Sequence, residues 1–441
     1  MTPALARAPA LARALPRALY ASALWLATPL LFARLWWRGR REPLYRQFWA
    51  ERLGHTQAGP VPHGCVWIHA VSLGETQAAR PLLEALRAQR PGVRLLLTHG
   101  TATGRAAGAA LLQEGDAQAW LPFDTPAAIA RFLRNHRPAV GVLMETEIWP
   151  GLLHAAQASG VPMVLANARL SARSLAKGQR LALLMRPAVA VFSRVLAQTD
   201  ADAQRLLAAG AVPAAMQVVG NLKFDLSPSA ALLTQGANWR ETVRSATGRP
   251  VVLMASSRAG EEAELLAAWQ ALPLTFTRPL LLLVPRHPQR FDEVAAMLMA
   301  AGLRVSRRSA WTAQPAADDV LADVWLGDSL GEMPLYYAAA SVALLGGSFA
   351  PLGGHNLIEA AACGCPLLMG PHTFNFAAAA ELSLAAGAAL RTADMASAVQ
   401  EAATLASEEA QRAAMSAAAL AFAAKHRGAA ARMAAEVLRL G

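Results

Sequence analysis

The sequence predicts an α/β protein built from two doubly wound domains that follow an apolar N-terminal segment. Short runs rich in Val, Ile and Leu recur along the chain, and each precedes a polar or glycine-containing turn and an Ala/Leu/Arg-rich helical pattern. One polar segment, 226–250, interrupts this rhythm. With 441 residues and 54% hydrophobic content, the chain is long enough for two or three domains of roughly 150 residues each.

The N-terminal segment combines positive charge with an apolar stretch. Residues 1–52 contain nine arginines against two glutamates, a net charge of +7 within a total of +11. The uncharged stretch from Ala18 to Ala33 would form a helix roughly 24 Å long, shorter than the roughly 30 Å hydrocarbon core of a bilayer. We therefore expect this segment to bind membrane lipids, either spanning tightly with Arg34 snorkelling or lying in the interface. A cleaved signal peptide and a buried first helix are the alternatives. The flanking tryptophans favour a membrane surface over nucleic acid as the partner of this charge.

The apolar runs beyond this segment are expected to form parallel strands, because nearly continuous hydrophobicity suits a strand covered on both faces. In the first domain the runs are 65–71, 93–100, 117–123, 140–147, 162–168, 194–199 and 216–223. In the second domain they are 250–257, 280–287, 303–309, 320–325, 342–348 and 366–371, and the Ala-rich chain after Met395 predicts helices. The predicted division is 1–42 (extension and anchor), 43–225 (first α/β domain), 226–250 (connection) and 251–441 (second α/β domain).

A carboxylate, Glu75, stands where the first run gives way to a helical pattern. Ligands of doubly wound proteins bind at the carboxyl ends of the strands, so this is a position for chemistry. An acid in the first helical turn is also favourable to the helix dipole without any further role. As a general base it would be kept ionised by the helix start, and Gly74 would let a substrate approach the backbone.

Further polar residues follow the later strands of the first domain. Glu145 and Glu147 end the fourth run, and alternation puts both on one face of a buried strand. Two acids there are costly unless solvated or paired, which favours a functional interpretation. Asn167 and Arg169 follow the next run, and Lys223 is a lysine in an arginine-rich chain.

The second domain carries cations and two glycine-rich segments. Arg286 follows a predicted strand and could fork onto phosphate oxygens. Glycines in 327–332 and 346–371 precede helices, leaving backbone N–H groups for an anion, and Glu359 could accept hydrogen bonds from ribose hydroxyls. Together these segments indicate a nucleotide site.

No metal and no cofactor are expected. Cys65, Cys363 and Cys365 are too few for a disulfide framework, fit a reducing compartment and are interpreted as small buried residues. Asp200 and Asp202 spell D-x-D but are interpreted as the N-cap and first-turn acids of a helix. H-E-x-x-H, P-loop and G-x-S-x-G motifs are absent from the sequence.

The motifs, taken in order, resemble those of a known family. WIHAVSLGE, THGTATG, LPFD, METEIWP, NARLSARS, QTDADAQRL, GNLKFD, PRHPQRF, GDSLGE, GGSFAPLGGHNLIEA and MGPHTFNF occur between about Leu19 and Ala380. In this order they are similar to the bacterial 3-deoxy-D-manno-oct-2-ulosonic acid (Kdo) transferases, with the first 17 residues as an extra extension. The resemblance implies a glycosyltransferase B-type fold, with two Rossmann-like domains facing a cleft, on the cytoplasmic face of the inner membrane. It also implies transfer of Kdo from CMP-Kdo, a co-substrate, to a lipid A precursor, with acceptor and donor bound by the first and second domains.

The resemblance also assigns residues. It implies that Glu75 is the general base and that Glu145 and Lys223 stabilise the transition state. The CMP-binding residues that it implies are Pro285, Arg286, Leu330, Gly331, Glu332, Asn356, Leu357, Ile358 and Glu359. Candidates on the acceptor side are Ser72, Gly74, Thr101 and Arg169. This chain departs from the usual motifs at Leu330, where Met is common, at Leu357, where Pro is common, and at Ser257-Arg258, where Thr-His is common.

A single base suffices for an inverting displacement when the leaving group needs no protonation, so inversion is expected. A transferase of the same fold that uses a UDP-sugar and a lipid-linked acceptor is an alternative function. A non-enzymatic membrane adaptor is another, which the nucleotide-type loops and the acids at strand ends disfavour. A nicotinamide enzyme lacks its G-x-G-x-x-G motif after the first strand.

Overall fold

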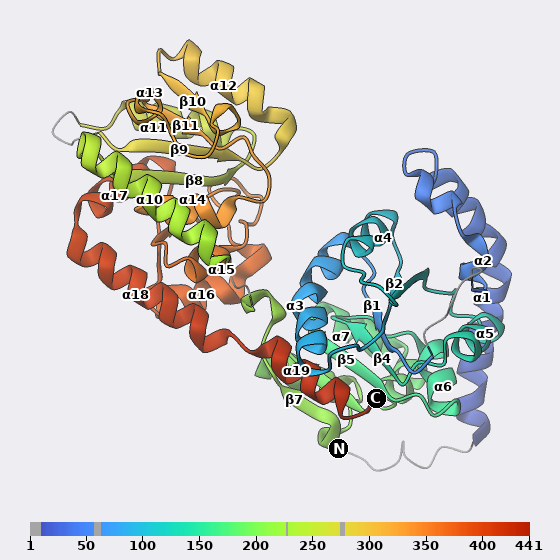
Figure 1. The fold of residues 1–441 in the computed structure, drawn as a ribbon. Coiled ribbons are helices and arrows are strands. Elements are labelled where there is room, and N and C mark those ends of the chain that lie inside the picture. Colours follow the sequence, from blue (N-terminus) through green and yellow to red (C-terminus); the bar gives the residue numbers. More distant parts are fainter. Residues whose placement is uncertain (1–9, 57–62, 226–227, 274–277) are drawn as a thin grey trace. The chain divides into compact units, whose positions relative to one another are not determined.

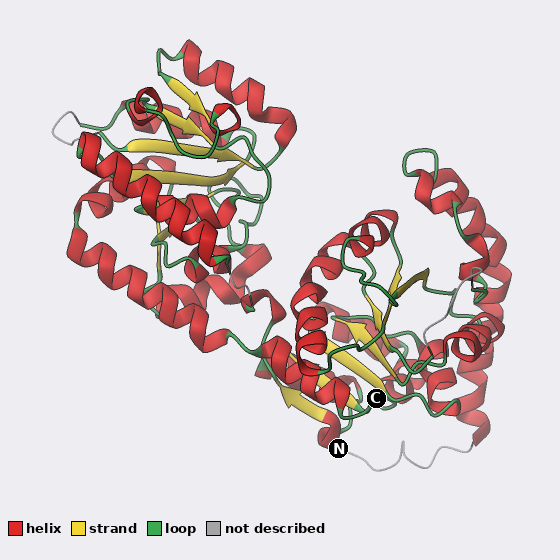
Figure 2. Cartoon of the chain, in the orientation of Figure 1, coloured by secondary structure: helices red, strands yellow, loops and turns green. Residues whose placement is uncertain are grey.

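The computed structural model describes residues 10–56, 63–225, 228–273 and 278–441. These residues form two compact units (Figures 1 and 2). Unit 1 contains the described residues up to Asp225 together with Arg427–Gly441, and unit 2 contains those from Pro228 to His426. Each unit is a parallel sheet covered by helices, as the apolar runs predict.

Unit 1 is built on a seven-stranded parallel sheet of order β3-β2-β1-β4-β5-β6-β7. Every predicted run of the first domain contains one of these strands. The strands are β1 (Val66–His69), β2 (Leu95–His99), β3 (Ala117–Trp120), β4 (Val140–Met144), β5 (Met163–Ala168), β6 (Arg194–Ala197) and β7 (Met216–Val218). Alternate residues of β1 enter two separate cores, Trp67 on one face and Ile68 on the other, which confirms that both faces are covered.

The strand order of unit 1 reverses between β1 and β4, which are paired in parallel along Val66–His69. This reversal is the switch point at which doubly wound sheets bind ligands, and Glu75 and Glu145 follow these two strands. The helices are α2 (Trp49–Arg52), α3 (Leu73–Gln89), α4 (Ala102–Ala109), α5 (Pro126–His136), α6 (Pro150–Ala158), α7 (Ala172–Arg180), α8 (Ala182–Val189) and α9 (Asp200–Ala209), with 3-10 turns η2 (Pro43–Arg46), η3 (Pro213–Ala215) and η4 (Leu222–Phe224).

The N-terminal segment is one long helix, α1 (Ala10–Arg38), which continues through Pro16 and Pro29. Within the described residues it is the one helix long and apolar enough, by length and composition, to cross a membrane. One of its faces lies against unit 1: the Tyr20 hydroxyl donates to Asp124 at 2.8 Å, and the Phe32 ring packs on Trp49 at a centroid distance of 5.2 Å.

Unit 2 repeats the architecture with a second seven-stranded parallel sheet of order β10-β11-β9-β8-β12-β13-β14. Six of its strands overlap predicted runs, although β11 extends one residue beyond its run, and β14 was not predicted because three residues in an Ala-rich stretch give no periodic signal. The strands are β8 (Val251–Ser257), β9 (Leu280–Pro285), β10 (Val305–Arg307), β11 (Val324–Leu326), β12 (Val342–Leu345), β13 (Leu367–Met369) and β14 (Ala389–Arg391). Here the order reverses between β8 and β12.

The predicted connection 226–250 is corrected, because most of it is a helix of unit 2, α10 (Ala230–Thr247). Its Trp239 is fully buried and packs edge-on against Trp311 and Trp325, so this segment belongs to the core of the unit. The other helices of unit 2 are α11 (Glu261–Gln270), α12 (Phe291–Ala300), α13 (Ala317–Val320), α14 (Met333–Ala339), α15 (Leu357–Ala362), α16 (Ala377–Ala385), α17 (Met395–Ser407) and α18 (Glu409–His426), with 3-10 turns η5 (Pro288–Arg290), η6 (Arg308–Ala310) and η7 (Phe374–Phe376).

The C-terminal boundary of the second domain is also corrected. The last helix, α19 (Ala429–Leu438), packs in unit 1 against α3, where Met433 and Val437 join the same core as Ile68. Arg194 reinforces this contact with a 2.9 Å ion pair to Glu436. The helices predicted after Met395 are confirmed, but the last of them crosses back to the first sheet because its apolar face completes that core.

Candidate active site

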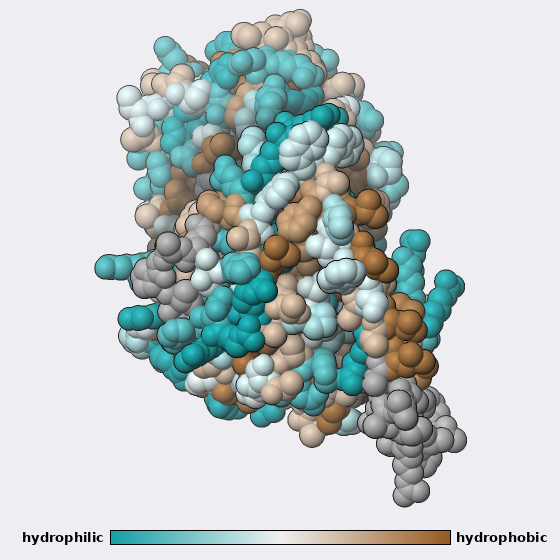
Figure 3. Space-filling model, turned by 90° about the vertical axis from the view of Figure 1, so that its right-hand side faces the viewer, coloured by the Kyte–Doolittle hydropathy of each residue, from teal (hydrophilic) through white to brown (hydrophobic). Residues whose placement is uncertain are grey.

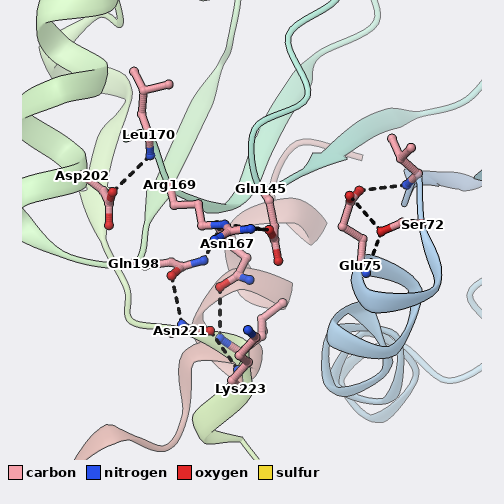
Figure 4. A network of polar contacts seen from close by, with 12 residues as sticks. Ser72, Glu75, Glu145, Asn167, Arg169, Leu170, Gln198, Asp202, Asn221 and Lys223 are labelled. Atoms are coloured by element: carbon pink, nitrogen blue, oxygen red, sulfur yellow. Dashed lines mark hydrogen bonds and ion pairs between the residues drawn. The ribbon is translucent and has the colours of Figure 1, made fainter. Parts of the chain in front are cut away.

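The Glu75 carboxylate lies in the first turn of α3, directly after β1, and it is bonded to the loop that precedes the helix. Ser72 is the N-cap, and its hydroxyl accepts from the Glu75 N–H. In return, one carboxylate oxygen of Glu75 accepts from the Val71 N–H at 2.8 Å and the other from the Ser72 hydroxyl at 3.1 Å (Figure 4). Ser72 therefore caps α3 and Glu75 bonds back to the residue before the cap, so the helix-start interpretation is correct as far as it goes.

The two hydrogen bonds to the loop leave acceptor positions of the Glu75 carboxylate unoccupied. A carboxylate has about four acceptor positions and two are used here, so each oxygen keeps a lone pair. Burial raises the pKa of Glu75, and the Glu145 carboxylate raises it further, although the Val71 N–H opposes this. A carboxylate with a raised pKa is a stronger base, nearer to neutral pH. The geometry therefore allows Glu75 to hold the loop before α3 and to accept a proton.

The loop that precedes Glu75 has free space beside Gly74 and is held by a hydrogen bond from Thr101. A Cβ at Gly74 would meet only the Ser72 hydroxyl, at 3.9 Å, so packing within unit 1 does not require a glycine there. Thr101 lies on the supporting side: it caps α4, and its hydroxyl donates to the Val71 carbonyl at 3.0 Å. Thr101 thus holds the loop that carries Ser72.

Glu145 directly follows the adjacent strand, β4, and its charge acts on Glu75. The expectation that Glu145 and Glu147 alternate along a strand is wrong, because β4 ends at Met144 and both acids lie in the following turn. Glu145 has a left-handed backbone, with φ of 56°, which ends the strand. Its buried carboxylate accepts from the Arg169 guanidinium at 2.7 Å. A non-glycine residue in this conformation costs roughly 1 kcal/mol or more, and such strain is concentrated at functional sites.

The segment that carries Lys223 is held on the same side of the site by Asn167. Asn167 is fully buried and also left-handed, with φ of 52°, and its amide oxygen accepts from the Leu222 N–H at 3.1 Å. The next residue is Lys223, whose own N–H donates to Asn221. Burial lowers the pKa of Lys223, whereas the charge of Glu145 raises it. Figure 4 shows Glu75 on one side and Glu145, Arg169 and Lys223 on the other.

A third carboxylate, Glu147, shares this region and was not assigned a role of its own from the sequence. Its carboxylate accepts from the Trp149 indole N–H at 2.8 Å. Burial, followed by the charge of Glu75, raises the pKa of Glu147 to about 7. Glu147 therefore changes charge close to neutral pH within the influence of the proposed base.

In unit 2 the predicted nucleotide residues lie at the carboxyl end of the second sheet. Pro285 ends β9, and the Arg286 N–H donates to the Ser257 carbonyl at 3.0 Å, joining the ends of β9 and β8. Leu330 is 75% exposed, and Gly331 is left-handed with φ of 81°. Glu332 is the N-cap of α14, and its carboxylate forms a 2.8 Å ion pair with Arg308, a partner that the sequence did not indicate.

The remaining predicted donor residues form the start of α15. Asn356 is its N-cap and accepts from the Ile358 N–H at 3.2 Å. Leu357 and Ile358 are 1% exposed, so a ligand could reach only their backbone. Burial raises the pKa of Glu359, and the positive charge of Arg286 partly opposes this. The positive charge of Arg286 therefore acts on the Glu359 carboxylate.

Two sequence features remain structural. Thr199, and not Asp200, is the N-cap of α9, and Asp202 bonds back to the Thr199 hydroxyl at 2.6 Å and to the Leu170 N–H at 3.1 Å. The cysteines are free, and Cys65 and Cys365 are buried. Among the described residues, no cluster of three or more His, Cys, Asp or Glu side chains could hold a metal ion.

Two parallel seven-stranded sheets, each with polar residues at its switch point, make up the fold of the B-type glycosyltransferases. A family model described as 3-deoxy-D-manno-octulosonic-acid transferase (kdotransferase) matches residues 47–226. The chain is 51% identical to the 3-deoxy-D-manno-octulosonic acid transferase of Bordetella pertussis, over 94% of this chain and 96% of that protein. It is 35% identical to the enzyme of the same name from Haemophilus influenzae, over 82% and 83%. The chain therefore belongs to the Kdo transferase family and is a glycosyltransferase that transfers Kdo from CMP-Kdo in lipopolysaccharide biosynthesis.

Solved structures agree with this fold. The structure of Anabaena HepE in complex with UDP matches with a TM-score of 0.55 at 16% identity, covering 85% of this chain and 99% of that chain. A UDP-N-acetylglucosamine 2-epimerase matches with a TM-score of 0.54 at 15% identity, over 86% and 96%. At these identities the likeness concerns the fold alone.

Proposed function

We propose that this Kdo transferase moves Kdo onto a hydroxyl group of the glucosamine disaccharide of a lipid A precursor, with inversion, and that Glu75 is the general base. The observation that carries the proposal is the position of the Glu75 carboxylate, at the switch point of unit 1, with free lone pairs and a raised pKa. Glu75 takes the proton of the acceptor hydroxyl while that oxygen attacks C2 of Kdo. The bond from C2 to the phosphate oxygen breaks, and CMP leaves with the electron pair.

Glu145, Arg169 and Lys223 are proposed to supply the electrostatic part of catalysis. The ion pair of Glu145 with Arg169 fixes one carboxylate, and Lys223 adds a cation within the influence of Glu145. Fixed charges in a partly desolvated site stabilise developing charge without reorganising during the reaction. Ser72 and Gly74 border the open side of the loop, where the acceptor sugar would approach Glu75.

The donor is proposed to bind in unit 2 through the residues that the family resemblance implies. Arg286 can fork onto the phosphate of CMP, and Glu359 can accept from ribose hydroxyls. The exposed Leu330 and the backbone of Gly331 border the same end of the sheet, and Leu357 and Ile358 contribute backbone groups only.

Helix α1 is proposed to hold the enzyme at the cytoplasmic face of the inner membrane by lying in the interface. Leu15, Leu19, Leu26, Leu30 and Trp37 are 62–73% exposed. At roughly 100° per residue, they lie on the face of α1 opposite to the residues that contact unit 1. Figure 3 views the protein from the side on which α1 runs, and apolar residues reach the surface there. A helix with one face on its own domain has the opposite face left for lipid, which favours lying flat over spanning.

The experiment is Kdo transfer from CMP-Kdo to a tetra-acylated lipid A precursor, with products identified by mass and by the configuration of the new bond. Glu75→Gln keeps an oxygen for the Val71 N–H but removes the base, so we expect its turnover to fall by roughly 10²- to 10⁴-fold. Glu84→Gln, an exposed glutamate on the same helix, is the matched control and should be unaffected. Full activity of Glu75→Gln would reduce Glu75 to its capping role, and retention of configuration would reject the single-base mechanism.

A further inference from the structure

A cluster formed by Arg258, Arg286 and His355 lies near the switch point of unit 2. Of these three residues, only Arg286 is among the proposed donor residues discussed above. Arg258 follows β8, and Gly347 follows β12, the strand beside it. A Cβ at Gly347 would meet His355 Nε2 at 3.3 Å and Arg258 Cγ at 3.7 Å. These two side chains therefore line the space in front of Gly347, although they are far apart in the sequence.

Arg286 adjoins this pair. Its backbone N–H donates to the carbonyl of Ser257, the residue before Arg258. Burial, and then the positive charges of Arg286, Arg258 and His287, lower the pKa of His355 to about 4, so its ring is neutral at pH 7. His355 Nε2 is buried without a hydrogen-bond partner among the described residues. Because the ring is neutral and its other nitrogen bonds to the Ser256 backbone, Nε2 can accept a hydrogen bond from a ligand hydroxyl.

The nearby carboxylates are already engaged. Glu261 accepts from the backbone N–H groups of Arg258 at 2.9 Å and Gly347 at 2.8 Å, which ties the two loops together. Glu262 accepts from the Ser257 hydroxyl and from Arg290, at 2.8 and 2.6 Å. The Arg258 backbone is thus fixed, and none of the ion pairs within the described part of the chain involves its guanidinium.

The chemistry of the donor calls for two cationic subsites side by side. In a 2-ulosonic acid the anomeric carbon, C2, carries the C1 carboxylate. In CMP-Kdo the same carbon is bonded to the phosphate oxygen. The two anions are therefore separated by only a few bonds, and a site with one arginine would leave one of them without a charged partner. Arginine suits a carboxylate because its guanidinium donates two parallel hydrogen bonds.

We infer that Arg258, which lies beside His355, binds the sugar carboxylate of CMP-Kdo through its guanidinium, while Arg286 binds the phosphate. This inference rests on the proposed binding of CMP in unit 2 and adds the element that distinguishes CMP-Kdo from nucleotide sugars without a carboxylate. It also gives a role to one of the positions at which this chain departs from the family motif, Ser257-Arg258 in place of Thr-His. At position 258, histidine and arginine can both donate hydrogen bonds to an anion, and arginine adds a permanent charge.

The test compares CMP with CMP-Kdo in the full-length enzyme. For Arg258→Gln we expect the KM for CMP-Kdo to rise roughly 10- to 100-fold, as for the loss of a charged hydrogen bond, while the Kd for CMP stays within about twofold of wild type. Arg258→His should recover part of the affinity for CMP-Kdo. Arg304→Gln is the matched control, because it also removes one arginine from unit 2, but Arg304 lies just before β10 and its side chain pairs with Asp323.

Three outcomes would overturn the inference. One is a KM for CMP-Kdo in Arg258→Gln that changes no more than in Arg304→Gln. Another is a loss of CMP affinity equal to the loss for CMP-Kdo, which would assign Arg258 to the nucleotide or to the fold. The third is a kcat that falls while KM stays at its wild-type value. Wild-type enzyme that binds CMP but transfers no Kdo would instead contradict the proposed function, so the two failures are separable.

Discussion

The hydroxyl of Tyr20, on the exposed N-terminal helix, donates a 2.8 Å hydrogen bond to the buried carboxylate of Asp124. The same carboxylate accepts the N–H groups of Gly151 at 2.9 Å and Leu152 at 2.6 Å, in the first turn of α6. That helix directly follows the turn with Glu145 and Glu147. Asp124 therefore links the proposed membrane helix to the segment that carries the acids of the site.

We expect Tyr20→Phe to lower the free energy of unfolding by about 1.5–3 kcal/mol, because it removes a hydrogen bond to a charged, buried group. Chemical denaturation of purified protein measures the change. Ser22→Ala removes an exposed hydroxyl from the same helix and should leave stability within about 0.5 kcal/mol of wild type. Equal stability of Tyr20→Phe and Ser22→Ala would mean that α1 is not held through Asp124.

The exposed face of α1 gives a prediction about membrane binding. Leu26→Asp and Leu30→Asp place a charge on a face that is 69–73% exposed in the protein and proposed to enter lipid. Each loses the transfer free energy of a leucine side chain, about 1.5–3 kcal/mol, so binding to anionic vesicles should weaken about tenfold or more. Vesicle co-sedimentation measures this. Leu321→Asp alters a leucine that is 49% exposed in unit 2 and should bind like wild type; binding by Leu26→Asp at the wild-type level would argue against the interfacial placement.

Two helical glycines are expected to respond to alanine with opposite signs. A Cβ at Gly236 in α10 would overlap the carbonyl oxygen of Leu335 and the side chain of Ala338 in α14, whereas at Gly178 in α7 it would meet no atom within 4 Å. Gly236→Ala should destabilise by about 1–3 kcal/mol through overpacking. Gly178→Ala should stabilise by about 0.5–1 kcal/mol, because alanine loses less backbone entropy in a helix. Thermal and denaturant unfolding of both variants test this; a stabilised Gly236→Ala would contradict the packing of α10 on α14.

The sequence predicts the strands well because their burial on both faces leaves an unbroken apolar run, and the strand ends then locate Glu75, Arg286 and Glu359. It fails where tertiary contacts decide. The apolar face of α19 predicts a helix but not which core it completes, and Gly236 suggests a linker although it marks the close approach of α10 to α14.

Two kinds of feature in the site could not be predicted from the sequence. One is an unusual backbone conformation, and the other is the proximity of residues that are far apart in the chain. Alternation fails at Glu145 because a left-handed residue ends the strand. Arg258 and His355 are brought together by the pairing of β8 with β12. Ser256, just before this pair, is left-handed too, with φ of 58°. Of the non-glycine residues with positive φ in the described ranges, Glu145 and Ser256 lie at the switch points and Asn167 lies on the neighbouring strand β5, so strain would have been a useful signal had it been visible in the sequence.

The last prediction concerns the pH dependence of catalysis. Because burial and Glu145 raise the pKa of Glu75, the acid limb of kcat/KM in wild type should lie above the ordinary pKa of a glutamate, about 4.3. Glu147, with a pKa of about 7, is still protonated and neutral on this acid limb, and it is not among the groups that shift the pKa of Glu75. Glu147→Gln should therefore leave the acid limb in place and remove only a change of kcat/KM close to pH 7. Glu84→Gln is the control and should keep the wild-type profile throughout.

The same substitution has a consequence for stability, with a defined sign. The folded state holds a proton on Glu147 up to about pH 7, whereas the unfolded state releases it near pH 4.3, so the folded state binds more protons in between. Wild type should therefore lose stability as pH rises through this window, and Glu147→Gln should lose less. Denaturant unfolding at pH 5 and pH 8 gives the comparison: a stability difference between the two proteins that does not change with pH would show that Glu147 titrates normally, and the change of kcat/KM close to pH 7 should then be absent as well.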